Sequence, residues 1–325
     1  MLKDILEIFL LTYNRKKKLQ ETFHQIFEHS SPIKNLDMTI LNNKSTDGTT
    51  ELIEMYRKGF PNINHVINKK NIGGNANIVK AFEMASKKYV WFLCDDDCYD
   101  WKYWNEIEEG LLQEYDAILT ERKIDFKSDD YHILINTLAF LPAAIYKTEL
   151  INDDVVQNAS FNICYSLPHL ALAAYFVNEK KKALIPKHKI LTQRVNHEHT
   201  KGLKFIHPRY KSGHLVINYI NSYQMITDKK ERYKCCSVLF IGKSFAYSMK
   251  HLITEYKELN RYNICDILNG ISFIQKVIFL LIICKNLLLK QIIDIYKTDK
   301  EVSIKLFNKF KTRIFSNKLF GLKPR

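Results

Sequence analysis

The segment YVWFLCDDD, residues 89–97, places an apolar run directly before three consecutive aspartates. Tyr89–Leu93 has the length and the aromatic and β-branched composition of a buried strand, whereas acids are depleted within strands. Adjacent carboxylates repel one another, so the position of Asp95, Asp96 and Asp97 at a strand end favours a bound cation. Mg²⁺ and Mn²⁺ prefer hard oxygen ligands and often share them with substrate phosphates. The alternative is an acidic turn that caps the next helix.

Three strand–helix units precede this segment. Strands are predicted at Glu7–Thr12, Met38–Leu41 and Asn64–Ile67, and each is followed by a helical pattern, the first over residues 16–29 and the last ending at Ala85. The βαβαβαβ order predicts an α/β fold with a mainly parallel sheet covered by helices. Ligands of open α/β sheets bind at the carboxyl ends of strands, so the polar clusters after the strands are expected to meet at one edge. These clusters are residues 12–15, 42–48, 71–75 and 95–97.

The pattern continues more loosely beyond the aspartates. Residues 101–113 predict a helix, Ala117–Thr120 a strand, and residues 161–177 a hydrophobic helix that contains His169. Late strands are predicted at Ala183–Ile185 and Lys189–Thr192.

Composition narrows the possible partners. The chain has 325 residues and a net charge of +14, which suits nucleic acid, an anionic membrane surface or a nucleotide-bearing substrate. It shows no helix-turn-helix, RRM, KH or zinc-binding signature, so nucleic acid is not the expected partner. The seven cysteines form no paired framework, which favours free thiols and a reducing cytoplasm. No apolar stretch reaches the roughly 18 uninterrupted residues expected of a membrane-spanning helix.

The C-terminal region, residues 205–325, has a helical and basic pattern. Residues 271–290 are highly apolar, and protein core, a dimer interface and a membrane-facing surface all fit them. Residues 301–325 interleave Ile, Leu and Phe with seven Lys and Arg residues against one Glu. Such a helix can lie on an anionic membrane surface, which is our expectation for this tail. The alternative is a helical bundle packed on the preceding domain.

Four segments together resemble the signature segments of family-2 glycosyltransferases, in order and spacing. They are IFLLTYNR (8–15), LNNKSTDGTTE (41–51), NKKNIGGNANIVKAFEMA (68–85) and YVWFLCDDD (89–97). The closest likeness is to bacterial transferases of surface-polysaccharide and lipooligosaccharide assembly, strong over residues 5–100 and loose over 101–195. The resemblance implies a GT-A fold, which is a Rossmann-like sheet flanked by helices. It also implies a nucleotide-sugar donor, most often a UDP-sugar, a glycan or lipid-linked glycan acceptor, Mn²⁺ or Mg²⁺, and inverting transfer.

The resemblance also implies site residues. The family usually has an acid against the pyrimidine ring where this chain has Asn42, although an amide can also read a base edge. Asp47 matches an acid that more often shapes the turn than touches ligand. Asp97, with Asp95, would hold the metal ion. The implied nucleotide-sugar-binding residues are Thr12, Tyr13, Arg15, Asn42, Asn43, Asn71, Gly73, Asn75, Asp95 and Asp96.

Inverting transfer needs a general base for the acceptor hydroxyl. The family commonly supplies an acid, but the loosely matching segment FNICYSLPHLALAAYF, residues 161–176, contains none. The candidates, in order, are Asp154, His169 and Asp153. Imidazole titrates near neutral pH, but His169 fits equally a buried histidine bonded to a backbone carbonyl. The alternative for the aspartates is a helix N-cap pair.

Two late histidines, His197 and His199, could join the metal shell or contact a diphosphate with Arg194 and Lys201. The alternative is a solvated loop.

These inferences divide the chain into a catalytic domain and an appended region. Residues 1–204 form the GT-A domain, with a nucleotide-binding half over 1–100 and an acceptor half over 101–204. Residues 205–325 follow as the helical region. The expected location is the cytoplasm, at the inner face of the cell membrane. Two other interpretations stay open: an inactive membrane-associated relative that acts as a scaffold, and a nucleotidyltransferase, although the segment TYNRKKK lacks the early glycine loop of that class.

Overall fold

A computed structural model describes residues 2–28, 31–121, 126–127, 129–165, 167–192, 219 and 222–238. All of them belong to one of two compact units of the chain, residues 1–270. The predicted membrane tail, residues 301–325, and the apolar stretch 271–290 lie outside the described residues, as do Arg194, His197, His199 and Lys201.

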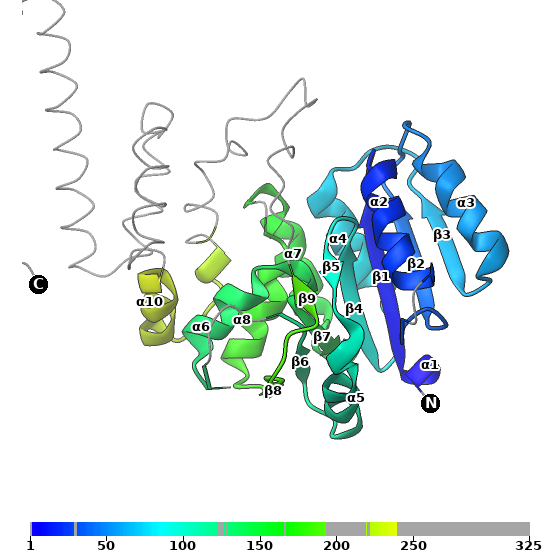
Figure 1. The fold of residues 1–325 in the computed structure, drawn as a ribbon. Coiled ribbons are helices and arrows are strands. Elements are labelled where there is room, and N and C mark those ends of the chain that lie inside the picture. Colours follow the sequence, from blue (N-terminus) through cyan, green and yellow to red (C-terminus); the bar gives the residue numbers. More distant parts are fainter. Residues whose placement is uncertain are drawn as a thin grey trace, which may run out of the picture. The chain divides into compact units, whose positions relative to one another are not determined.

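The described residues form a mixed sheet of seven strands in the order β3-β2-β1-β4-β7-β6-β8 (Figure 1). β1, β2, β3 and β4 pair in parallel, and β7 runs antiparallel to both β4 and β6. A separate short ribbon pairs β5 with β9. The strands are β1 (Leu6–Thr12), β2 (Asp37–Asn42), β3 (Ile63–Ile67), β4 (Tyr89–Cys94), β5 (Cys98–Tyr99), β6 (Ala117–Leu119), β7 (Ala144–Lys147), β8 (Ala183–Leu184) and β9 (Leu191–Thr192).

Helices connect these strands. The longer ones are α2 (Lys16–Phe23), α3 (Thr49–Gly59), α4 (Gly74–Met84), α5 (Trp104–Leu112), α6 (Tyr131–Leu138), α7 (Asp153–Phe161), α8 (Leu170–Asn178) and α10 (Lys229–Val238). The short ones are α1 (Leu2–Ile5), η1 (His24–Glu28), η2 (Trp101–Tyr103), η3 (Leu141–Ala143), η4 (Thr148–Leu150) and η5 (Asn162–Tyr165). α2 and α3 pack together through Phe23 and Tyr56, whose ring centroids lie 4.7 Å apart. The return from β3 to β4 reverses the direction of winding, which puts α4 on the other face of the sheet.

The strand order reverses between β1 and β4, since the chain winds outward from β1 to β3 and then returns to β4. Such a switch point leaves a crevice at the carboxyl ends of the two strands. Thr12 ends β1, and the three aspartates follow β4. The predicted sheet therefore brings the first and fourth polar clusters together.

The predicted helix over residues 161–177 is wrong. α7 ends at Phe161, η5 follows, and a new helix, α8, begins at Leu170 with His169 as its N-cap. Pro168 is the physical reason, because proline lacks a backbone N–H and disfavours a helical residue before it. The hydrophobic composition of both halves hid this break.

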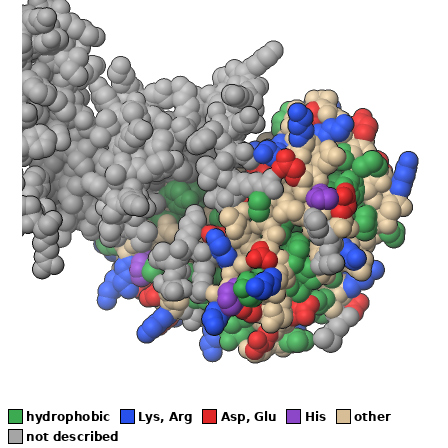
Figure 2. All heavy atoms as spheres, viewed as in Figure 1, with side chains coloured by type: hydrophobic (Ala, Val, Ile, Leu, Met, Phe, Trp, Pro, Cys, Tyr) green, Lys and Arg blue, Asp and Glu red, His purple; other side chains and the backbone are tan. Residues whose placement is uncertain are grey.

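Part of the C-terminal region packs on the preceding helices. The Tyr223 hydroxyl donates to Asn136 Oδ1 of α6 at 2.9 Å, and Asn178 Nδ2 of α8 donates to the Met225 carbonyl at 2.9 Å. Figure 2 shows acidic and basic side chains interspersed over the described part of one face, without a single basic patch there. Within the described residues, no helix is long and apolar enough to cross a membrane.

Candidate functional site

The acidic turn, Asp95–Asp97, is buried at the carboxyl end of β4. The three residues are 3%, 7% and 1% exposed. Thr22 Oγ1 of α2 donates to the Asp95 carbonyl at 3.0 Å, and Gln25 Nε2 donates to the Asp97 carbonyl at 3.2 Å. The next helix, η2, is capped by the Asp100 side chain instead. None of the three carboxylates therefore caps η2, and Thr22 and Gln25 fix the backbone of the acidic turn.

Residues from the end of β1 contact these carboxylates directly. Thr12 Oγ1 donates to Asp95 Oδ2 at 2.6 Å. Arg15 Nη1 lies 3.0 Å from Asp95 Oδ1 and 2.6 Å from Asp96 Oδ2. Burial raises the pKa of Asp95 to about 6, against the opposing effects of Arg15 and Thr12. Burial lowers the pKa of Arg15, but Asp95 and Asp96 outweigh it and raise that pKa overall.

The donor set of the acidic turn fits a hard divalent cation. Asp95 and Asp96 share the Arg15 guanidinium, Asp97 is buried beside them, and buried charge needs compensation. Within the described residues, no group of three or more His, Cys, Asp and Glu side chains could hold a metal ion. Mg²⁺ and Mn²⁺ commonly use one or two protein carboxylates and complete their shell with substrate phosphates. Such a cation would therefore bind together with a phosphate-bearing ligand.

Cys94 sits directly before the acidic turn. Burial raises its pKa well above the usual value, and the charges of Asp97, Asp95 and Asp96 raise it further.

The loops after β1 and β2 hold each other in place. The Thr46 amide donates to Asn14 Oδ1 at 2.7 Å. Asp47 Oδ2 accepts from the Lys16 amide at 3.0 Å, and Asp47 Oδ1 accepts from the Thr49 amide at 3.1 Å. Burial raises the pKa of Asp47, but these hydrogen bonds outweigh that effect and lower the pKa overall. Asp47 thus starts two helices at once, which is the turn-shaping role that the sequence predicted for it.

Asn42 points into the protein rather than toward the crevice. It is 0% exposed, its Oδ1 accepts from the Ser45 amide at 2.8 Å, and its Nδ2 donates to Thr50 Oγ1 at 3.0 Å. Both ends of the amide are therefore occupied within the corner between β2 and α3. This placement does not favour the predicted contact between Asn42 and a donor base.

An asparagine network joins the ends of β2 and β3 to the start of α4. Asn43 Nδ2 donates to Asn71 Oδ1 at 2.7 Å, and Asn43 Oδ1 accepts from Asn68 Nδ2 at 2.9 Å. Asn68 Nδ2 also donates to Asn77 Oδ1, and Asn77 Nδ2 donates to the Leu41 carbonyl at 3.1 Å. The network fixes the loop that carries Asn71 and Gly73. Asn68 and Asn77 were not predicted as site residues, although the repeated asparagines of NKKNIGGNAN were a signal for them.

The third loop offers backbone to the crevice. Gly73 has a φ of +86°, a conformation that favours glycine, and a Cβ there would meet nothing within 4 Å. Asn75 turns its Nδ2 to the Ile163 carbonyl at 2.8 Å, so it joins α4 to η5. Tyr13, in the first loop, is 37% exposed.

Asp153 and Asp154 lie away from the acidic turn. β7 runs against β4 so that Lys147 pairs with Tyr89, at the amino end of β4. The chain enters α7 from there, and the far end of that helix meets α4, where Asn75 contacts Ile163. A helix of nine residues spans about 13 Å. Asp153 and Asp154 are exposed in its first turn, and Asn152 supplies the cap, so the structure does not bring them to the carboxylates.

His169 is buried at the start of α8. Its Nε2–H donates to the Ala139 carbonyl at 2.8 Å, and Nδ1 has no hydrogen-bond partner. Burial lowers the pKa of His169 to about 4, against the effect of that bond, so the ring is neutral at pH 7. This is the carbonyl-bonded histidine that the sequence left open as an alternative.

Glu121 is a buried carboxylate that the sequence analysis missed. It is 4% exposed and follows β6, whose carboxyl end lies at the same edge as that of β4. The preceding carbonyl, of Thr120, accepts from the amides of Ile190 and Leu191 at 2.9 and 3.0 Å. Leu191 in turn pairs with Tyr99, just after the acidic turn. A single acid after a short strand has no motif that would have revealed it.

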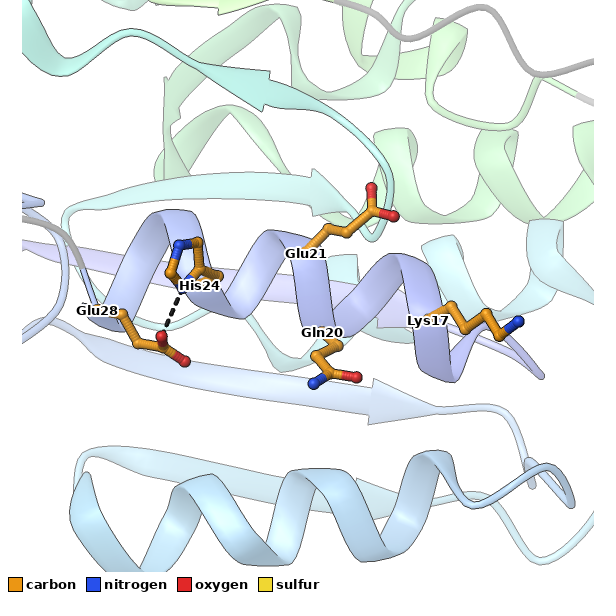
Figure 3. Close-up of a pocket in the computed structure, with 5 residues that line it drawn as sticks. All are labelled: Lys17, Gln20, Glu21, His24 and Glu28. Carbon is orange, nitrogen blue, oxygen red and sulfur yellow. Dashed lines mark hydrogen bonds and ion pairs between the residues drawn. The ribbon is translucent and has the colours of Figure 1, made fainter.

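A depression of about 440 Å³ runs along α2 and η1, away from the acidic turn (Figure 3). Its lining comes from that helical segment alone: Lys17, Gln20, Glu21, His24 and Glu28.

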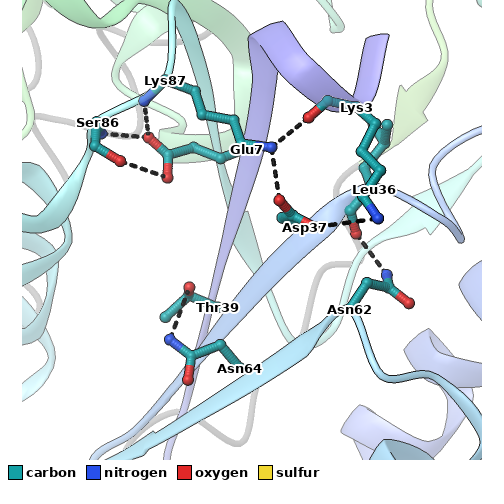
Figure 4. Close-up of polar contacts among 9 residues, drawn as sticks. All are labelled: Lys3, Glu7, Leu36, Asp37, Thr39, Asn62, Asn64, Ser86 and Lys87. Carbon is teal, nitrogen blue, oxygen red and sulfur yellow. Dashed lines mark hydrogen bonds and ion pairs between the residues drawn. The ribbon is translucent and has the colours of Figure 1, made fainter. Parts of the chain in front are cut away.

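A set of polar contacts lies at the amino end of the sheet. Glu7 accepts from the Lys87 amide at 2.7 Å, and Lys87 Nζ lies 2.7 Å from Asp37 Oδ2 (Figure 4). Those contacts join β1, β2 and the start of β4, which is a structural role.

Comparisons with known proteins agree with this geometry. The model of glycosyl transferase family 2 matches residues 7–165. This part of the chain belongs to that family, and the chain thus carries a glycosyltransferase domain. One similar protein is TuaG of Bacillus subtilis, whose name gives it as a candidate glycosyltransferase of teichuronic acid biosynthesis. It is 29% identical over 48% of this chain and 58% of its own length. The abequosyltransferase RfbV of Salmonella typhimurium is 31% identical over 34% of each chain. The chain thus matches about half or less of the length of these relatives.

Solved structures share the fold. Residues 1–349 of TarS from S. aureus, in complex with UDP-GlcNAc, superpose with a TM-score of 0.56 at 15% identity, over 82% of this chain and 79% of that one. A second crystal structure of the same TarS fragment gives a TM-score of 0.52 at 14% identity, over 77% of this chain and 80% of that one. The predicted α/β fold of GT-A type is confirmed for the described residues.

Proposed function

We propose that this chain transfers a sugar from a nucleotide-diphosphate donor to a glycan or lipid-linked glycan of the bacterial cell surface. The observation that carries the proposal is the buried acidic turn, held by α2 at the switch point between β1 and β4. One matched relative is named for teichuronic acid biosynthesis and another for abequosyl transfer, which supports a glycan as the acceptor class. A UDP-sugar is the proposed donor, since the similar fold of TarS binds UDP-GlcNAc.

Asp97 and Asp95 would hold Mn²⁺ or Mg²⁺ in this proposal. The cation would neutralise charge that develops on the leaving nucleoside diphosphate. Tyr13 is suited to lie against the base because its ring is partly exposed beside the crevice. The backbone around Gly73 and the start of α4 are suited to the anionic part of the donor, because helix N-termini offer free N–H groups.

The general base has two remaining candidates, His169 and Glu121. Asp153 and Asp154 lose support because they begin α7 at the opposite edge of the sheet. His169 has the free Nδ1 that a base requires, but its lowered pKa makes it a weak one. Glu121 supplies the carboxylate that an inverting mechanism uses, at the edge where the donor would bind.

The location at the inner face of the cell membrane is part of the proposal and rests on residues 301–325. Their seven basic residues among Ile, Leu and Phe favour an anionic surface. Flotation of the full chain with vesicles of anionic and of neutral lipid tests this. Equal recovery with both vesicle types, or with neither, would contradict it.

The first experiment is a thermal-shift series on the purified chain. UDP, CDP, GDP and dTDP are each added with and without Mn²⁺, and the series is repeated on Asp97→Ala. A ligand that binds only the folded state raises stability by RT ln(1 + [L]/Kd). We expect a Mn²⁺-dependent shift with UDP that Asp97→Ala abolishes. No shift with any of the four nucleotides would overturn the donor site.

A further inference from the structure

Arg15 joins the loop after β1 to the acidic turn after β4. Its Nη1 contacts both Asp95 Oδ1, at 3.0 Å, and Asp96 Oδ2, at 2.6 Å. The Arg15 side chain is 27% exposed, and those of the two acids are 5% and 9% exposed. Because the site is largely shielded from water, the attraction is stronger than in a surface ion pair.

A divalent cation and the Arg15 guanidinium would compete for the same carboxylates. A cation bound by Asp95 must either displace Arg15 or bind against its charge. A nucleotide diphosphate changes this balance, because a guanidinium pairs well with phosphate oxygens and can exchange one anion for the other. Arg15 lies at the crevice where the proposed donor would bind, so this exchange needs only a movement of its side chain.

We propose, on the basis of the function proposed above, that Arg15 is an internal counter-ion that keeps Asp95 and Asp96 from a divalent cation until a nucleotide diphosphate engages the guanidinium. Cation and nucleotide then bind interdependently, and each raises the affinity for the other. Arg15 is a positioning residue in this scheme. The family resemblance implies only that Arg15 binds the nucleotide-sugar, so the counter-ion role goes beyond it.

The test is a titration of the full chain with Mn²⁺ alone, in which electron paramagnetic resonance measures the free aquo ion. The variants are Arg15→Ala and Arg57→Ala. Arg57 is the matched control, because its loss removes the same charge from an exposed site where Nη1 lies 3.5 Å from Glu54. We expect Arg15→Ala to bind Mn²⁺ about tenfold more tightly than the wild type, or better, since a nearby unit charge is removed. Arg57→Ala should match the wild type.

A further variant guards against misfolding. If Arg15→Ala does not fold, Arg15→Gln keeps hydrogen-bond donors without the charge, and the same gain is expected. Unchanged or weaker Mn²⁺ affinity in the folded Arg15 variant would overturn the counter-ion role, and it would leave the proposed function intact provided that the wild type binds UDP with Mn²⁺. If the wild type binds no UDP with Mn²⁺ present, both proposals fail.

Discussion

Gln25 in η1 holds Asp97 and Tyr99, at the C-terminal end of the acidic turn. Its Nε2 donates to the Asp97 carbonyl at 3.2 Å, and its Oε1 accepts from the Tyr99 amide at 2.9 Å. One amide side chain therefore fixes the backbone of residues 97–99, which begins with the proposed metal ligand. The position of Asp97 depends on a helix that lies 72 residues earlier in the chain.

Gln25→Ala should weaken both the fold and the site. Two backbone groups lose their partner, which costs about 1–3 kcal/mol of unfolding free energy. The affinity for UDP with Mn²⁺ should fall several-fold because the turn is no longer fixed. Urea denaturation and calorimetric titration measure the two effects. Gln20→Ala, at an exposed position of α2, is the control, and equal behaviour of the two variants would contradict the role of Gln25.

Asp95 should make stability fall as the pH rises. Its folded-state pKa of about 6 lies above the ordinary aspartate value of 3.8, so the folded chain binds the extra proton between these two values. Stability is therefore lost as pH rises from about 4 through about 6. Asp95→Asn removes this effect and should unfold at a higher temperature than the wild type at pH 7, without added metal. The advantage should be on the order of 2 kcal/mol and vanish near pH 4.

Thermal melts from pH 4 to pH 8 test this prediction. Glu83→Gln, at an exposed position of α4, controls for the loss of one negative charge. If the wild type is more stable than Asp95→Asn at pH 7, burial does not control the pKa of Asp95 and the prediction is wrong.

Asn77→Ala should loosen the third loop through the asparagine network. The change removes the side-chain donor to the Leu41 carbonyl and one of the two acceptors of Asn68 Nδ2, which costs about 1–3 kcal/mol. Hydrogen exchange should rise at residues 71–75, ahead of any global unfolding. Asn64→Ala is the control, since Asn64 is exposed and has one long bond of 3.4 Å to Thr39. Faster exchange only by global unfolding would contradict a local role.

The two candidates for the base give opposite expectations. Glu121→Gln should lower kcat by about 10²–10⁴-fold if this carboxylate takes the acceptor proton, with UDP affinity unchanged. His169→Gln should then affect stability rather than kcat. Asp154→Asn serves as the control, because that residue is exposed at the start of α7. The reverse result for Glu121 and His169 would assign the proton to the imidazole, and a loss in Asp154→Asn would restore the order that the sequence suggested.

The sequence predicted the strands of the sheet well, but it did not predict which side chains of the site point into the protein. The strand ends at Thr12 and near Leu93 follow from local hydrophobic runs, and their position at the switch point follows from chain order. Asn42 could not be placed, because the direction of an amide depends on partners such as Thr50 that only the folded corner supplies. Glu121 was hidden for a similar reason, since strand pairing rather than a motif brings it to the carboxyl edge.

The thiol of Cys94 gives the site an unusual chemical property. A cysteine beside a ligand site is an attractive point for a covalent inhibitor, but only the thiolate reacts well with an electrophile. Burial and the neighbouring carboxylates raise the pKa of Cys94, so its thiol stays protonated at neutral pH in the metal-free chain. Cysteine-directed warheads should therefore leave Cys94 unmodified, and a reversible ligand that replaces the diphosphate is the better starting point for inhibition.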